Sequence, residues 1–174
     1  MKDKKIIVML PAYNEEKDLP GLLNRIKLAL DPWANYRILV VDDGSRDQTA
    51  QIVRNMGSKM PLELIQHPQN MGLGAAMRTG LKAAAYNSDI VITLDADNSQ
   101  DPELIKTMVQ RLDEGFDVVG AEEGGVGIAE LAQVFLGELG FGHAGAFFGE
   151  ELRADSGAFI GGDGNSGEFG VRGD

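Results

Sequence analysis

The stretch Ile90–Pro102, with the sequence IVITLDADNSQDP, decides the fold expected for this chain. Its first residues, Ile90 to Leu94, form an apolar run of the length typical of a strand that is buried on both faces. The run ends abruptly at Asp95, and a helix is expected soon afterwards, with Asp101 as its N-cap and Pro102 as its first residue. Acidic side chains therefore gather at the C-terminal end of a buried strand, where open α/β sheets bind their ligands.

Two of these acids, Asp95 and Asp97, have the spacing of a cation site. In extended backbone their carboxylates point to the same side, about 6.6 Å apart, so one cation can reach both. An isolated pair at this spacing is weak evidence in a chain with 27 acidic residues. With no cysteine and only two histidines, any metal here would be bound through oxygen, which favours Mg²⁺ or Mn²⁺. We therefore predict that residues 95–97 hold a hard divalent ion on a diphosphate.

Composition narrows the class of protein. A chain of 174 residues with 43% hydrophobic content is expected to form one domain with a substantial core. A net charge of −11 argues against binding to nucleic acid, which needs a basic surface. The apolar run that follows the basic N-terminus is too short for a signal peptide, and no segment approaches the ~20 apolar residues of a membrane span.

Apolar patterning predicts short strands that alternate with amphipathic helices. Such an alternation forms a mostly parallel sheet flanked by helices, a Rossmann-like α/β fold. The expected strands are Ile6–Leu10, Arg37–Val41, Leu62–Gln66, Ile90–Leu94 and Asp117–Gly120. The expected helices start near Asp18, at a capping box of Ser45 and Gln48, at Leu73 and at Pro102. Residues 128–139 are compatible with a further helix, and Phe147, Phe148 and Leu152 with an apolar patch.

Polar residues follow these strands on one edge of the predicted sheet. Tyr13 and Glu15 are compatible with a nucleotide site or with a simple surface turn. Residues 42–45 (DDGS) are compatible with a carboxylate on a base N–H or with a turn that caps a helix. Residues 70–74 (NMGLG) are compatible with phosphate binding by backbone N–H groups or with a turn that needs glycine. His67, in a loop beside a proline, is expected at the surface.

Four motifs then occur in a specific order: VMLPAYNEE (8–16), LVVDDGSRDQT (39–49), NMGLGAAMRTG (70–80) and LDADNSQDPE (94–103). In this order they resemble the nucleotide-binding half of the family 2 glycosyltransferases, and most of all the polyprenyl-phosphate branch typified by dolichol-phosphate mannose synthases. The resemblance covers residues 4–120. It implies a GT-A fold and an inverting, metal-dependent hexosyltransferase.

The resemblance also implies a role for individual residues. Asp97 would be the main metal ligand and the catalytic residue, and Ser99 stands where relatives often carry a further ligand, Gln. The other implied positions are Pro11, Ala12, Tyr13 and Glu15 around the nucleotide, Val41 and Asp43 at the base, and Asp95 and Ala96 at the sugar diphosphate and metal.

The implied reactants are a nucleotide-diphosphate sugar and a lipid phosphate, with Mg²⁺ or Mn²⁺ as cofactor. The metal would act as a Lewis acid on the leaving diphosphate. A lipid phosphate is already an anion, so the reaction needs no general base. We therefore expect a cytoplasmic protein that associates peripherally with the inner face of the membrane.

The sequence departs from the family pattern after residue 120. Relatives continue with Gly-Ser-Arg, whereas residues 120–125 read GAEEGG, and acidic side chains there would repel a phosphate acceptor. Most of the 23 glycines also lie in residues 121–174. We therefore expect a nucleotide-sugar-binding domain over residues 1–120 and an atypical tail over 121–174. We hypothesise that this tail is out of frame, otherwise non-native or disordered, the alternative being a divergent acceptor lobe.

Two other functions are compatible with the sequence. One is a nucleotide-sugar-binding module that does not turn over. The other is a phospho-receiver domain, in which Asp42, Asp43 and Asp95 would surround Mg²⁺. A receiver domain would also need a lysine at a later strand end, and no lysine follows Lys106.

Overall fold

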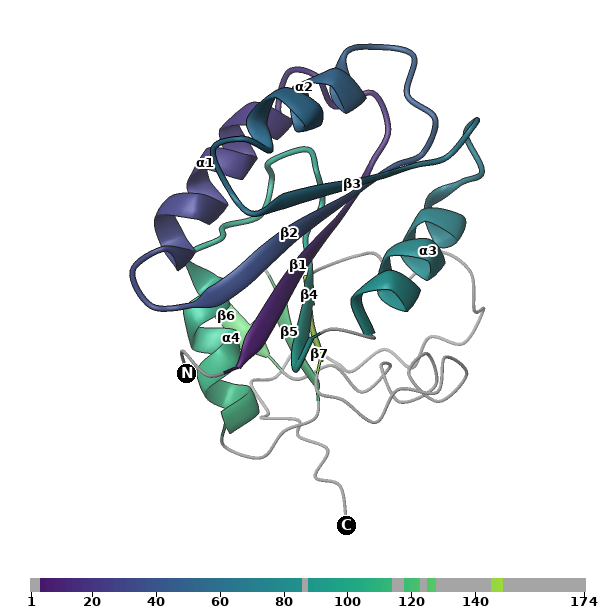
Figure 1. Cartoon of the computed structure of the whole chain (residues 1–174). Helices are drawn as coiled ribbons and strands as arrows, with labels where there is room; N and C mark the ends of the chain where they lie inside the picture. Colours follow the sequence, from purple (N-terminus) through teal and green to yellow (C-terminus); the bar gives the residue numbers. More distant parts are fainter. Residues whose placement is uncertain (1–3, 86–87, 114–117, 123–124, 128–144, 149–174) are drawn as a thin grey trace.

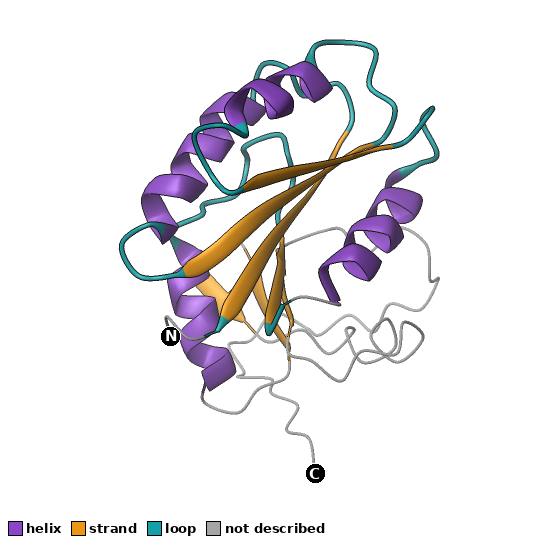
Figure 2. Cartoon of the chain, viewed as in Figure 1, coloured by secondary structure: helices purple, strands orange, loops and turns teal. Residues whose placement is uncertain are grey.

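The computed structural model describes residues 4–85, 88–113, 118–122, 125–127 and 145–148. Its strands and helices alternate along the first four strands (Figures 1 and 2). The strands are β1 (Lys5–Ala12), β2 (Asn35–Asp42), β3 (Leu62–Gln66), β4 (Ile90–Thr93), β5 (Val118–Glu122), β6 (Gly125–Gly127) and β7 (Gly145–Phe148). The helices are α1 (Leu19–Leu30), α2 (Thr49–Met56), α3 (Leu73–Ala85) and α4 (Leu104–Asp113).

The strands form one sheet in the order β3-β2-β1-β4-β7-β5-β6. All neighbouring pairs are parallel except β5 and β6, which confirms the predicted, mostly parallel α/β sheet. Ala12 pairs with Asp42, and Met9 pairs with Thr93, so β1, β2 and β4 end close to one another. The loops that follow these three strands therefore meet at one edge of the sheet.

Alternate residues of the sheet pack into two separate cores. On one face, Ile6, Val8 and Leu10 of β1 pack with α1, α2 and α4. On the other face, Ile7 and Met9 pack with α3. Figure 1 shows this arrangement, with α3 on the opposite side of the sheet from the other helices. Because each fully buried aliphatic side chain contributes about 1.5–3 kcal/mol, these two layers hold the strand ends in place.

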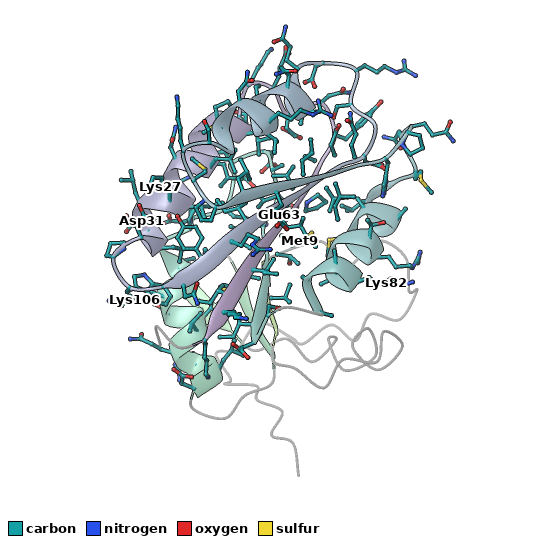
Figure 3. The ribbon with its side chains drawn as sticks, viewed as in Figure 1. Met9, Lys27, Asp31, Glu63, Lys82 and Lys106 are labelled. Atoms are coloured by element: carbon teal, nitrogen blue, oxygen red, sulfur yellow. The ribbon has the colours of Figure 1, made fainter. Side chains whose placement is uncertain are left out.

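Helix α3 lies close against the sheet because Gly80 faces it. A Cβ at Gly80 would lie 2.6 Å from Met9 Cγ, 2.7 Å from Met9 Sδ and 3.0 Å from Val41 Cγ2. Figure 3 labels Met9 on the side of the sheet that α3 covers. The small residue therefore sets how near α3 comes to β1 and β2 of the sheet.

The expected elements agree with the structure within about two residues, apart from the start of α2. Strands β6 and β7 were not predicted. The expected helix over 128–139 lies outside the described residues, as do Leu152 and the side chains of Phe147 and Phe148. Strand β7 belongs to the predicted tail, yet it pairs with β4 and β5. The domain boundary at residue 120 remains a prediction.

No helix in the described ranges is long and apolar enough to cross a bilayer.

Candidate functional site

A cavity of about 320 Å³ lies where β1, β2 and β4 end. The strand-end loops line it on one side and the first turns of α3 on the other. The structure therefore brings Asp95 and Asp97 together with Tyr13 and Asp43. The lining residues are Pro11, Ala12, Tyr13, Glu15, Asp43, Asn70, Leu73, Ala76, Asp95, Ala96 and Asp97.

Two of the candidate residues do not line the cavity. Val41 is fully buried in the core that faces α3. Ser99 is exposed, and its backbone N–H donates to Asp97 Oδ1 at 2.9 Å. The roles assigned to these two side chains remain predictions, and the structure links Ser99 to the cavity only through Asp97.

The first loop, residues 13–16, is held by the second loop through reciprocal hydrogen bonds. Asn14 has a φ of 60°, a left-handed conformation that asparagine tolerates well. Its backbone N–H donates to Ser45 Oγ at 2.9 Å, and its Oδ1 accepts from the backbone N–H of Arg46 at 2.9 Å. The backbone N–H of Glu15 donates to Thr49 Oγ1 at 2.8 Å. These bonds fix the positions of Tyr13 and Glu15 beside the cavity.

These contacts correct the predicted capping box at the start of α2. Ser45 accepts from Asn14, and the backbone N–H of Gln48 donates to Glu16 Oε2 at 3.1 Å. The first turn of α2 is bonded by Asp47 instead, whose Oδ1 accepts from the backbone N–H of Thr49 at 2.9 Å. The helix therefore begins at Thr49, and Ser45 belongs to the junction between the two loops.

The buried carboxylate of Asp43 holds a third loop, residues 67–72, against the cavity. Its Oδ1 contacts His67 Nδ1 at 2.6 Å and accepts from the Met71 N–H at 2.9 Å, while its Oδ2 accepts from the Gly72 N–H at 2.7 Å. Burial alone would raise the pKa of Asp43, but the hydrogen bonds from His67, Met71 and Gly72 outweigh it and hold this pKa below its ordinary value. Asp43 is therefore ionised at neutral pH.

His67 is buried, which corrects its predicted surface position. Its backbone N–H donates to Asp42 O at 2.8 Å, and its Nε2 lies 3.0 Å from Thr79 Oγ1 in α3. The ring thus lies between β3, α3 and the second loop. The sequence gives no local signal for this environment, because every partner of His67 is 12 or more residues away.

The acidic loop that follows β4 has its own supports. Gln100 bonds Asp95 twice, because its Oε1 accepts from the Asp95 N–H and its Nε2 donates to Asp95 Oδ2, both at 2.8 Å. Arg25 of α1 donates to Asn98 Oδ1 at 2.8 Å and to Asp101 Oδ1 at 2.9 Å. These contacts support the loop that carries Asp95 and Asp97 at the edge of the cavity. The sequence analysis missed Gln100 in this role.

Negative charge accumulates at the cavity around Glu15. Burial raises the pKa of Glu15, and the nearby charges of Asp97, Asp18, Asp47 and Asp95 raise it further. A divalent cation bound by Asp95 and Asp97 would relieve this repulsion, so the donor set fits such an ion. Within the described residues, no three Asp, Glu or His side chains converge on one point. The protein would therefore contribute two carboxylates, and a bound diphosphate and water would complete the coordination.

Replacing Glu15 with glutamine is expected to raise the melting temperature at pH 7. Because the folded-state pKa of Glu15 is raised, the ionised carboxylate destabilises the folded protein above this pKa. As the pH falls toward 4, the group becomes protonated in both states and the destabilisation disappears. The gain at pH 7 should be a few tenths to about 1 kcal/mol.

Thermal denaturation of Glu15→Gln and the parent chain at pH 7 and pH 4 tests this. The difference between the two proteins should shrink as the pH falls. Glu103→Gln, at an exposed position outside the cavity, is the control and should give no such gain. A Glu15→Gln protein that is less stable than the parent at pH 7 would contradict the assigned charge cluster.

Ala76 lines the cavity, a role that the sequence analysis missed. Its spacing in the apolar stripe of α3 indicated core packing, and it does pack in the core beneath that helix. It also reaches the cavity because it lies near the N-terminal end of α3. A small residue at this position leaves room in the cavity.

The receiver-domain alternative does not fit the structure. Asp42 is buried and accepts from the Ser45 N–H at 3.0 Å and from Gln66 Nε2 at 2.8 Å. In the described part of the chain, it forms no metal-binding group with Asp43 and Asp95.

Solved structures share this fold. The chain is similar to S. aureus TarS 1–349, with a TM-score of 0.58 and 30% identity over 73% of this chain and 39% of that one. TarS has also been solved in complex with UDP-GlcNAc. A second similar structure is glucosyl-3-phosphoglycerate synthase from Mycobacterium tuberculosis, solved with Mn²⁺, UDP and phosphoglyceric acid. Its TM-score is 0.56, with 26% identity over 78% of this chain and 49% of that one.

The chain is also similar to curated proteins that are named as transferases. The undecaprenyl-phosphate 4-deoxy-4-formamido-L-arabinose transferase of Aeromonas hydrophila is 40% identical over 122 residues, which are 67% of this chain and 36% of the relative. The Pseudomonas fluorescens protein of the same name is 39% identical over 122 residues, 68% of this chain and 35% of the relative. The chain thus spans about a third of the length of these relatives. The sequence profile "Glycosyl transferase family 2" matches residues 7–127, more than half of the chain, and the chain therefore belongs to this family.

Proposed function

We propose that this chain binds a nucleotide-diphosphate sugar and acts in an inverting glycosyltransferase that transfers the sugar to a polyprenyl phosphate. The observation that carries the proposal is the cavity that joins Asp95 and Asp97 to Tyr13 and Asp43. Neighbours solved with UDP, UDP-GlcNAc and Mn²⁺ support the donor class. Relatives named as undecaprenyl-phosphate transferases support the acceptor class.

The nucleoside would occupy the part of the cavity between the first and second loops. Tyr13 is 38% exposed and lines the cavity, so its ring is available to stack on a base. A carboxylate has about four acceptor positions, and three internal donors, from His67, Met71 and Gly72, make four contacts with Asp43 because the Met71 N–H is shared between its two oxygens. An N–H from a base would therefore take the place of the longest of these contacts, the one from Met71 to Oδ2 at 3.1 Å.

The diphosphate would lie against Asp95, Ala96 and Asp97. Asp97 is the proposed main metal ligand, because its Oδ2 accepts no hydrogen bond from the described residues. Asp95 contributes Oδ1, while Gln100 holds its Oδ2. A divalent ion at these carboxylates would supply Lewis acidity that stabilises negative charge on the leaving diphosphate.

Transfer of the sugar to a phosphate acceptor needs no general base from this part of the chain. The acceptor oxygen is already an anion and needs no proton removed before it attacks the sugar. The main tasks of these residues are therefore to orient the donor and to stabilise the departing diphosphate. This division of tasks is compatible with a cavity whose lining includes four carboxylates, three alanines and one tyrosine.

Thermal shift with UDP and GDP, each with and without Mn²⁺, tests the binding step. UDP with Mn²⁺ at 100 times its Kd should stabilise the chain by about 2.7 kcal/mol, a rise of several degrees in Tm. Either nucleotide without metal should give a smaller shift. No shift with any combination would refute the proposal.

Adding undecaprenyl phosphate and a UDP-sugar tests the transfer step. An enzyme releases UDP in proportion to the glycosylated lipid. A chain that binds UDP with Mn²⁺ but releases none would be the nucleotide-sugar-binding module without turnover.

A further inference from the structure

His67 is placed to control the orientation of the Asp43 carboxylate. The residue follows β3 directly, and its backbone N–H continues the pairing with β2 by donating to Asp42 O. Its ring is only 9% exposed. One nitrogen lies 2.6 Å from Asp43 Oδ1, and the other lies 3.0 Å from Thr79 Oγ1. The ring therefore links the Asp43 carboxylate, which lines the cavity, to Thr79 of α3.

The direction of these bonds follows from the chemistry of the partners. Asp43 is ionised and can only accept, so His67 Nδ1 carries a hydrogen and donates it. The Thr79 hydroxyl can donate or accept, so it satisfies Nε2 in either form of the ring. Both ring nitrogens are thereby paired, and the imidazole is fixed with its Nδ1–H directed at the carboxylate.

Without this bond, Asp43 would be held only by the backbone N–H groups of Met71 and Gly72. The Met71 N–H lies 2.9 Å from Oδ1 and 3.1 Å from Oδ2, so it is shared between the two oxygens and does not by itself select one rotamer. The Gly72 N–H bonds Oδ2, and His67 provides the matching bond to Oδ1. Donors to each of the two oxygens therefore define the plane of the carboxylate.

We propose that His67 is a positioning residue that orients Asp43 toward the base of the nucleotide donor. This inference rests on the proposed function, because it assumes that a nucleoside lies against Asp43. His67 itself does not line the cavity and acts only through Asp43. Its effect should therefore fall on recognition of the nucleoside and not on binding of the diphosphate.

Three substitutions in the full chain separate positioning from packing. His67→Asn keeps an N–H donor near the position of Nδ1, His67→Gln keeps a polar group near Nε2, and His67→Leu keeps neither. Each protein is titrated with UDP and with inorganic pyrophosphate, both in the presence of Mn²⁺. UDP reports on the nucleoside and the diphosphate together, whereas pyrophosphate reports on the diphosphate alone.

The expected result is that His67→Asn binds UDP within about threefold of the parent chain. His67→Gln and His67→Leu should bind it about tenfold to a hundredfold more weakly, the range expected when a hydrogen bond to a charged group is lost. Pyrophosphate affinity should stay the same in all of them. If His67→Gln, which preserves more of the packing volume, binds UDP better than His67→Asn, or if both probes weaken together, the inference is wrong.

A measurement without nucleotide keeps this inference separate from the proposed function. Amide hydrogen exchange reports on the Met71 and Gly72 N–H groups that Asp43 accepts. These two amides should exchange at least about tenfold faster in His67→Gln than in His67→Asn, because a mobile carboxylate protects them less. Equal exchange in the two variants would overturn the positioning role even if UDP binds, whereas faster exchange in a chain that binds no nucleotide would refute only the proposed function.

Discussion

Replacing Gly44 with alanine is expected to lower the free energy of unfolding by about 3 kcal/mol or more. Gly44 has a φ of +70°, and a Cβ there would lie 2.3 Å from the carbonyl carbon of Gln69 and 2.6 Å from the backbone N of Asn70. These atoms belong to the backbone and cannot rotate aside as a side chain does. The cost of the left-handed conformation and the cost of the clash therefore add.

The Gly44→Ala substitution should also change the shape of the cavity. Gly44 follows Asp43, whose carboxylate bonds the N–H groups of Met71 and Gly72. If the loop at residues 67–72 moves away from a new methyl group, these bonds must lengthen and the wall that contains Asn70 must shift. We expect Gly44→Ala to lose most of its UDP affinity in addition to its stability.

Gly72→Ala is the matched control for this prediction. Gly72 also has a left-handed conformation, with a φ of +90°, but a Cβ there would meet nothing within 4 Å. Its substitution should therefore cost only the conformational term, about 1–2 kcal/mol. Urea denaturation of both variants measures the difference. Equal destabilisation would show that contact with residues 69 and 70 does not determine the requirement for glycine at position 44.

The order of strands and helices was predictable because local patterns of apolar residues specify each element. The apolar run Ile90–Leu94 and the helical spacing over Leu73–Ala85 each specify one element without reference to the rest of the chain. The two core layers follow from the same alternation, since neighbouring residues of β1 face opposite helices. Parallel pairing then places the ends of β1, β2 and β4 together, and this made a shared cavity predictable.

The contacts that shape the cavity were not predictable in the same way. Asn14 bonds Ser45 and Arg46, which are 31 and 32 residues away, and His67 bonds Asp43, 24 residues away. Nothing in the local sequence of these residues indicates the partner. The capping box at Ser45 failed for this reason, because a partner from the first loop competes for the same hydroxyl.

Burial of Val41 illustrates another limit. Its position in a motif predicts a role at the base, but its place in β2 directs the side chain into the core beneath α3. A motif gives the order of residues along the chain, whereas the pleat of the strand decides which side chains reach the cavity. Asp43, two residues later and beyond the end of the strand, does reach it.

Replacing Asp97 with asparagine is expected to weaken Mn²⁺-dependent binding of UDP by about a hundredfold or more. Asp97 is exposed at the cavity, and of its two oxygens only Oδ1 accepts a hydrogen bond from the described residues. The asparagine side chain would keep that bond through its own amide oxygen, so the local turn should survive. It would lose the negative charge and the oxygen available to a cation. Loss of a residue that only hydrogen-bonds a metal ligand already costs about 10–100-fold in metal affinity, so loss of a ligand itself should cost at least as much.

The matched control is Asp101→Asn in the same loop. Asp101 is also an aspartate, but it bonds Arg25 and does not line the cavity, so its substitution should change UDP affinity less than about threefold. Titration of each protein with UDP, with and without Mn²⁺, separates the metal-dependent part of binding from the rest. Affinity without metal should be unchanged or slightly improved in Asp97→Asn, because one negative charge near the diphosphate is gone. Equal losses in the two variants would mean that acidity of the loop as a whole, and not a cation held by Asp97, governs the affinity for the donor.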